Sequence, residues 1–218
     1  MATASSASIG DWGTPFGMLI EHLVDEAGTD AVADFTVGDL DAFYKQARLK
    51  FDDDESFKAR SRERERVVKL QGRRDSQTTA LWSVLVAEST RHFNEPYAKL
   101  GILLTDDDLA GESTYQFLMP DVLTRLESAG LLIESDGAEV VFVPGFTNRE
   151  GAPLPLIVLA RTGGFNYATS DLACVIDRVE HVKATLLLYV IGTEQAQHLQ
   201  MVWAVAEMAG WLRPPVRP

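Results

Sequence analysis

Small and polar residues that could take part in binding or catalysis follow a long apolar run near the end of the chain. The run covers residues 184–191 and is typical of a strand buried on both faces of a parallel sheet. The residues that follow it are Gly192, Thr193, Glu194 and Gln195, with His198 one helical turn further on. In doubly wound folds, ligands bind beyond the carboxyl ends of such strands. The residues by themselves therefore predict an α/β protein that could bind a small polar ligand at this edge.

Three consecutive acids, Asp106 to Asp108, are a second candidate for chemistry. A metal site would need further ligands at suitable spacing, and the sequence offers one cysteine, Cys174, and four histidines that lie far apart. We therefore expect these acids to start a helix, where they favour the positive end of its dipole.

Composition and missing motifs exclude several classes of function. The 218 residues carry a net charge of −12, which argues against a surface that binds nucleic acid as a whole, and DNA is not an expected partner. The phosphate-binding motifs G-x-x-x-x-G-K-[ST] and G-x-G-x-x-G do not occur. One cysteine, no secretory signal and no apolar run of about 20 residues predict a cytoplasmic protein without a membrane partner.

Helical patterns dominate the first 130 residues. We expect helices over 14–26, 39–71, 78–99 and 120–129. The second is highly charged, and alternation of Arg60, Arg62, Arg64 and Arg66 with glutamates indicates a solvated helix with intrahelical ion pairs, or alternatively a surface that faces RNA. The third helix should bury its regularly spaced apolar residues, which are Leu81, Leu85, Phe93 and Tyr97.

Turn signals organise the rest of the chain. Asp136-Gly137 predicts a hairpin of 131–135 and 139–143, and residues 155–160 read as a strand. Helices are expected over 170–182 and 194–209, on either side of the apolar run. At the first of these, Thr169 or Ser170 could cap the helix, with Asp171 favoured by its N-terminal dipole.

Six segments, in order from about residue 9 to residue 212, resemble arginyl-tRNA synthetase. The quoted segments are GDWG with FGMLIEHL at 10–23, ARLKFDDDESFKARSRERERVVKLQ at 47–71, LTDDDLAGEST at 104–114, PGFTNREG with PLIV at 144–158, YATSDLA at 167–173, and Gln195-x-Gln197-His198 with QMVWAVAEMAGW at 195–211. The resemblance implies a partial Rossmann catalytic domain of the class I type, a doubly wound parallel sheet, with a largely helical insertion that contains a β-hairpin. It also implies an order of parts: a disordered N-terminus at 1–8, the end of the first Rossmann half at 9–37, the insertion at 38–154 and the second Rossmann half at 155–218.

The same resemblance implies the substrate, the cofactor and the site. The family joins arginine to tRNA(Arg) with ATP and Mg²⁺. By resemblance Asp171 faces the guanidinium, Tyr167 packs against and hydrogen-bonds the substrate, Gln195 reaches its backbone end, and His198 lies near the same pocket. Each residue also has a structural alternative: a helix-terminus acid, a core tyrosine, a first-turn glutamine and a satisfied histidine.

The sequence departs from the family in ways that bear on activity. It contains neither the HIGH-type motif nor the KMSKS-type motif that handle ATP, and Ala160 and Thr162 stand where Lys and Asp are usual. We therefore expect a catalytic-core fragment that is inactive or weak by itself, with ATP binding in doubt. Two alternatives remain open: an arginine-binding paralogue, and a transferase that uses arginyl-tRNA without ATP.

Overall fold

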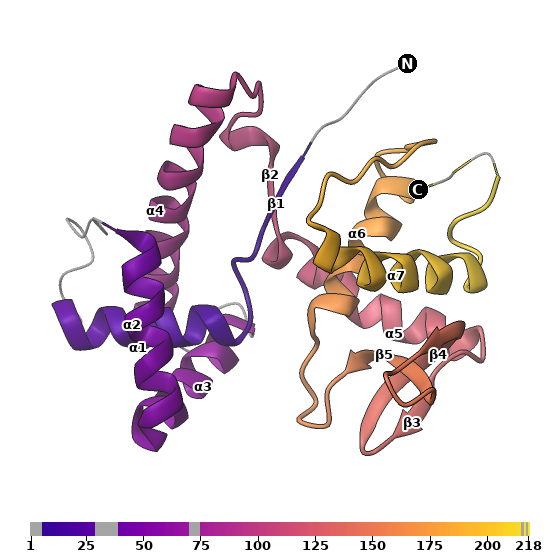
Figure 1. Ribbon diagram of the computed structural model, residues 1–218, viewed down its shortest axis with the longest axis horizontal. Helices are drawn as coiled ribbons and strands as arrows, with labels where there is room; N and C mark the ends of the chain where they lie inside the picture. The colour runs from indigo at the N-terminus through magenta and orange to yellow at the C-terminus, as the bar shows by residue number, and fades with distance from the viewer. Residues whose placement is uncertain (1–5, 29–38, 70–74, 215, 217) are drawn as a thin grey trace. The chain divides into compact units, whose positions relative to one another are not determined.

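The computed structural model describes residues 6–28, 39–69, 75–214, 216 and 218. They form two compact units, Met1–Ser113 and Thr114–Pro218, whose elements are labelled in Figure 1. No helix within these described ranges is long and apolar enough to cross a membrane. The domain order predicted above stays a prediction, and its boundary at 37–38 lies outside the described residues.

The first unit is helical, with one short pair of strands. Strand β1 (Ala7–Ile9) pairs in parallel with β2 (Leu109–Gly111), and helix α1 (Thr14–Ala27) follows with a proline in its first turn. Helix α1 packs most closely on α3 (Glu55–Lys69), and Gly17 permits this approach. A Cβ atom at Gly17 would lie 2.3 Å from the backbone oxygen of Ser61, so a larger residue would force the helices apart.

The single helix predicted over 39–71 is wrong, because two helices occupy the described part of that range. Helix α2 (Leu40–Asp53) ends at Asp54, whose backbone is extended, and α3 begins directly afterwards. The Asp54 carboxylate accepts hydrogen bonds from the backbone N–H groups of Ser56 and Phe57, at 2.8 and 3.1 Å. Asp54 therefore acts as an N-cap for α3, a role for which aspartate is well suited. Residues 70 and 71 of the predicted helix lie outside the described ranges.

Helix α4 (Ser76–Leu100) confirms the third predicted helix and extends it at both ends. Asp75 caps its start, the helix continues through Pro96, and Gly101 ends it in the left-handed conformation with φ 67°. Leu81 and Leu85 are buried as expected, but the prediction for Phe93 and Tyr97 is wrong, since Phe93 is exposed and Tyr97 is half-buried. Asp106 to Asp108 form one 3₁₀ turn, η1 (Asp106–Asp108), in a capping box with Thr105.

The described residues of the second unit form three α-helices and a small antiparallel sheet. The 3₁₀ segment η2 (Glu112–Leu118) leads into α5 (Met119–Ser128), and strands β3 (Ile133–Ser135), β4 (Ala138–Thr147) and β5 (Pro153–Leu159) pair in the order β3-β4-β5. Asp136 and Gly137 both have positive φ, at 51° and 76°, which confirms the predicted hairpin turn. Strand β5 lies beside the hairpin, and helix α6 (Tyr167–Glu180) packs on it.

The apolar run 184–191 is not a strand in this structure, so that part of the prediction is wrong. It is extended, with one isolated bridge residue at Leu186, and the described part of the chain contains no strand that pairs with it. Leu187 packs inward, while Leu188 and Val190 are 80% and 102% exposed. Two-sided burial of such a run requires neighbouring strands and a second covering layer. Beyond it, η3 (Thr193–Gln195) and α7 (Ala196–Met208) confirm the last predicted helix.

Candidate functional site

Helix α6 carries two of the predicted site residues, and it starts earlier than predicted. Asn166 is the N-cap, because its side chain accepts a hydrogen bond from the N–H of Ala168. The expected caps do other work: the Thr169 hydroxyl donates to the carbonyl of Val158 on β5, and that of Ser170 donates to the carbonyl of Tyr167. Asp171 is therefore the fifth helical residue and lies beyond the first turn. The helix dipole favours an acid most strongly within the first turn, so it favours Asp171 less. The helix-terminus alternative for Asp171 thus loses its basis.

Asp171, His198 and Tyr167 come together although they arise from two helices. The Nε2 atom of His198, on α7, lies 2.6 Å from Oδ2 of Asp171. The rings of Tyr167 and His198 meet edge to face, with 4.7 Å between centroids. Helices α6 and α7 pack together in the second unit, which brings residues 27 positions apart into contact (Figure 1).

Gln195 lies near this cluster in the chain, at the end of η3. It is exposed at the end of η3, directly before α7 and one helical turn ahead of His198. No hydrogen bond in the described part of the chain joins it to the other three residues. The structure therefore brings together three of the four predicted residues and leaves Gln195 at the start of the same helix.

The cluster presents an acceptor to solvent. The side chain of Asp171 is 36% exposed, and Tyr167 is 59% exposed. The Oδ2 atom of Asp171 accepts a hydrogen bond from His198. No described residue donates to its Oδ1 atom, and no described lysine or arginine pairs with this carboxylate. An accessible carboxylate with a free oxygen is a suitable partner for an incoming cation that donates hydrogen bonds, a guanidinium above all.

The side chains one turn further along α6 are structural. Cys174 is buried, and burial raises the pKa of its thiol and also that of the neighbouring Tyr115 hydroxyl. A thiol with a raised pKa is a poor nucleophile. Arg178 stacks over Tyr189 at 5.0 Å, and Tyr189 lies 5.2 Å from Trp203, so these residues hold the extended segment against α6 and α7.

Two features of the first unit were not predicted from the sequence. The carboxylate of Asp11 is buried and accepts hydrogen bonds from the N–H and the hydroxyl of Ser113, at 2.9 and 2.5 Å. The indole N–H of Trp82 donates to the backbone carbonyl of Asp11. The GDWG segment was the available signal, but its partner lies 102 positions away. This contact fixes the backbone around residues 10–13 and has no opening to a ligand.

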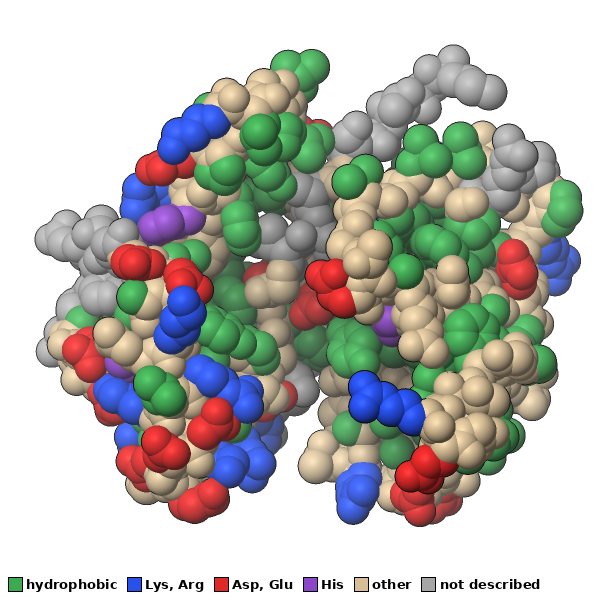
Figure 2. Space-filling model, viewed as in Figure 1, with side chains coloured by type: hydrophobic (Ala, Val, Ile, Leu, Met, Phe, Trp, Pro, Cys, Tyr) green, Lys and Arg blue, Asp and Glu red, His purple; other side chains and the backbone are tan. Residues whose placement is uncertain are grey.

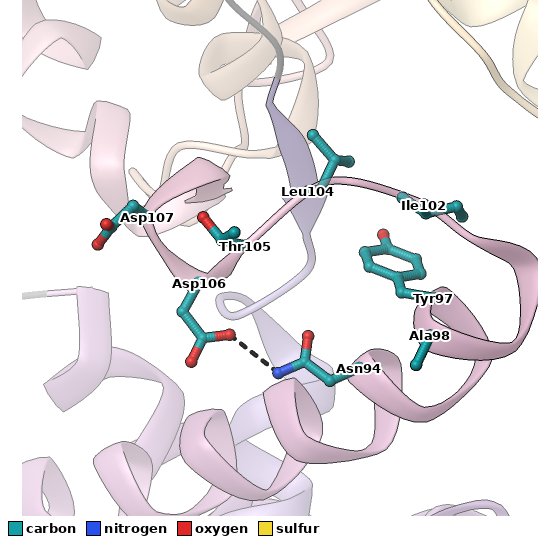
Figure 3. Close-up of a pocket in the computed structure, with 8 residues that line it drawn as sticks. All are labelled: Asn94, Tyr97, Ala98, Ile102, Leu104, Thr105, Asp106 and Asp107. Carbon is teal, nitrogen blue, oxygen red and sulfur yellow. Dashed lines mark hydrogen bonds between the residues drawn. The ribbon is translucent and has the colours of Figure 1, made fainter.

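The other unpredicted feature is a hollow of about 460 Å³ between the end of α4 and η1. The Asn94 side-chain amide donates to Asp106 at 2.9 Å. Figure 3 shows this bond crossing the hollow, with Tyr97 on the same helix as Asn94 and Asp107 pointing away from Asp106. The metal-site alternative for the three aspartates gains no support, because no group of three or more potential metal ligands occurs among the described residues.

Comparison with known families agrees with this architecture. Residues 4–217 match the family model described as tRNA synthetases class I (R), catalytic domain. Among curated relatives, an arginine–tRNA ligase of Thermobifida fusca is 50% identical over 204 residues, and that of Trichodesmium erythraeum is 47% identical over 208 residues. Each match covers 94% of this chain and about a third of the relative, 35% and 34% respectively.

Solved structures resemble the chain in fold. An arginyl-tRNA synthetase of Plasmodium falciparum matches with a TM-score of 0.79 at 22% identity, over 100% of this chain and 35% of its own. A putative arginyl-tRNA synthetase of Campylobacter jejuni matches with a TM-score of 0.52 at 14% identity, over 95% of this chain and 42% of its own. The likeness supports the class I synthetase catalytic fold for this chain.

Proposed function

We propose that this chain carries the part of an arginine–tRNA ligase that recognises the arginine side chain. The chain belongs to the arginine-specific class I tRNA synthetases, and this membership is the basis of the proposal. The observation that carries the proposal is the Asp171 carboxylate, which is accessible, is not paired with any described lysine or arginine, and is flanked by Tyr167 and His198. These are the residues at which the sequence resembles the family's arginine pocket.

Recognition would depend on charge and on hydrogen-bond geometry together. A guanidinium is planar, always charged and able to donate two parallel N–H bonds to one carboxylate. The exposed Tyr167 ring beside Asp171 would offer the guanidinium a flat surface, and Gln195 would extend the site toward the polar backbone end of the ligand. Specificity for arginine over lysine follows from the bidentate geometry, because an ammonium is a point charge.

The same residues do not fit ATP. A triphosphate needs positive groups and donors aimed at its oxygens. The four predicted site residues, Tyr167, Asp171, Gln195 and His198, include a carboxylate and neither lysine nor arginine, and the sequence lacks the HIGH-type and KMSKS-type motifs. We therefore derive no ATP-dependent step from these residues. ATP, Mg²⁺ and the adenylation reaction belong to the proposal for the whole ligase, of which this chain spans about a third.

The role of tRNA(Arg) as acceptor is likewise a proposal for the whole ligase. On the face in Figure 2, basic and acidic side chains intermingle over the helices of the first unit. Arg60 and Arg64 of the charged run reach Glu21 on α1, at 2.5 and 3.0 Å, so these two arginines tie helices together instead of pairing only within their own helix. This mixture favours the structural interpretation of the run over an RNA-facing surface.

Calorimetry on the purified chain tests the arginine proposal. Arginine should bind saturably, and citrulline, a neutral isostere, should bind at least about 30-fold more weakly because its urea group lacks the charge that pairs with Asp171. Absence of heat at millimolar arginine, or equal affinity for the two ligands, would contradict the proposal.

The matched control is Asp177, an acid on the same helix that also contacts a histidine. Asp171→Ala should weaken arginine binding at least about 100-fold, and Asp177→Ala should leave it unchanged. Binding without aminoacylation in the presence of ATP and tRNA is expected both of an inactive catalytic-core fragment and of the arginine-binding paralogue, whereas transfer from arginyl-tRNA without ATP would favour the transferase.

A further inference from the structure

His198 contacts two members of the candidate site from a different helix. Its Nε2 atom lies 2.6 Å from the Asp171 carboxylate, and its ring meets the Tyr167 ring edge to face. Asp171 and Tyr167 stand four positions apart on α6, whereas His198 belongs to α7. A single imidazole therefore restrains both the carboxylate and the aromatic surface that would receive a guanidinium.

The number of hydrogen-bond acceptor positions on the Asp171 carboxylate decides whether its contact with His198 competes with arginine. An ionised carboxylate has about four acceptor positions on its two oxygens, enough for a bidentate guanidinium and one further donor. His198 uses one position on Oδ2, and no described residue uses Oδ1. The histidine can thus remain bonded while a guanidinium binds to the remaining positions.

The direction of the hydrogen bond follows from the partner. A carboxylate only accepts, so Nε2 of His198 must carry the proton and donate, and in the neutral ring Nδ1 is then the unprotonated nitrogen. The side chain of His198 is 21% exposed and that of Asp171 is 36% exposed, so the histidine is the more buried partner of the pair.

We infer that His198 is a positioning residue, which fixes the Asp171 carboxylate and the Tyr167 ring for arginine and does not itself bind the ligand. This inference rests on the proposed function and deepens it. It also changes the role given to His198 by resemblance, from a residue near the substrate to one that acts through two others. Without it, both side chains would have to be ordered when arginine binds, and affinity would fall.

Variants of His198 test the inference through affinity. His198→Ala should weaken arginine binding about tenfold, the usual result of losing one hydrogen bond to a charged group. His198→Gln, which keeps an N–H donor, should recover part of the loss. His181→Ala is the matched control, because His181 contacts Asp177 on the same helix, and it should have no effect. Unchanged or tighter arginine binding in His198→Ala would overturn the inference.

Nitrogen-15 NMR of the histidine rings separates this inference from the proposed function. In the ligand-free chain the Nε2 proton of His198 should be protected from exchange with water by its bond to Asp171, and Asp171→Ala should remove that protection. In the wild type the protection should persist at saturating arginine. Protection that is unchanged in Asp171→Ala, or that is lost on adding arginine, overturns the positioning role. If arginine shows no binding, the proposed function fails, and the ligand-free measurement still decides whether His198 orients Asp171.

Discussion

His22 and His198 each lie near a carboxylate, but the two units use them in opposite ways. His22 is fully buried on α1, its ring lies 4.5 Å from that of Phe43, and its Nδ1 atom is 3.9 Å from the Glu26 carboxylate. Neither ring nitrogen meets hydrogen-bond geometry with a described residue. His198 is partly exposed and is bonded to Asp171 at 2.6 Å. The first histidine fills space in a core, and the second organises polar groups at a surface.

The role of a histidine therefore depends on its partners and its exposure, and not on its residue type alone. Burial lowers the pKa of His22, and Lys50 lowers it further, against the opposing effects of Glu26, Asp25 and Gln46. Burial removes water from the ring, so the charged imidazole is destabilised relative to the neutral one. The contact of His198 with a carboxylate instead gives that ring a defined tautomer and orientation.

The largest expected effect tests whether only the second arrangement serves a ligand. Asp171→Ala should weaken arginine binding at least about 100-fold, because both charge-assisted hydrogen bonds to the guanidinium are lost. Glu26→Ala, the corresponding change beside His22, should leave arginine affinity unchanged in the same calorimetric titration. Equal losses in the two variants would break the comparison.

The next effect concerns pH and belongs to His22. Because its folded pKa is lowered from the ordinary 6.5, the unfolded chain binds the proton more readily, so stability falls as pH drops below about 6.5. The loss reaches up to about 1.4 kcal/mol per pH unit until the folded pKa is passed. Urea denaturation of wild type and His22→Leu at pH 8, 6.5 and 5.5 measures it. As pH falls, the free energy of unfolding of the wild type should drop relative to that of the leucine variant. A constant difference between the two proteins across this pH range would contradict this account.

A smaller effect should mark the bond between α6 and α7. A double-mutant cycle on His198 and Asp171, read by urea denaturation at pH 7.5, should give a coupling of about 1 kcal/mol. The pair joins two helices, so truncating either partner also removes a tertiary contact. A coupling near zero would mean that the two side chains are neighbours without an energetic bond.

The smallest effect should come from His181 and Asp177, which form a similar contact within one helix. Their atoms lie 3.0 Å apart at the last turn of α6, in an exposed i,i+4 arrangement. Such pairs contribute about 0.2–0.5 kcal/mol. The same cycle should therefore give less coupling here than for His198 and Asp171, and a larger value would reverse the ranking of the two pairs.

Local signals in the sequence predicted the helices and turns whose causes are themselves local. Gly130 and Gly210 close their helices with positive φ, and Asp136-Gly137 makes the hairpin turn, because these residues tolerate a backbone conformation that others avoid. The resemblance added the identity of Tyr167, Asp171 and His198, which no periodicity or spacing could have related to one another.

The sequence alone predicts where most helices lie and which family the chain resembles. The remaining features depend on tertiary contacts, because the partners that form them are distant in the chain. Thr169 could have capped α6, but its hydroxyl is used by the Val158 carbonyl, and Asn166 became the cap. The run 184–191 had the pattern of a buried strand, but no described strand pairs with it. The Asp171–His198 contact exists only because α6 packs on α7, since hydrogen bonds between helices require the packing that brings them within 3 Å.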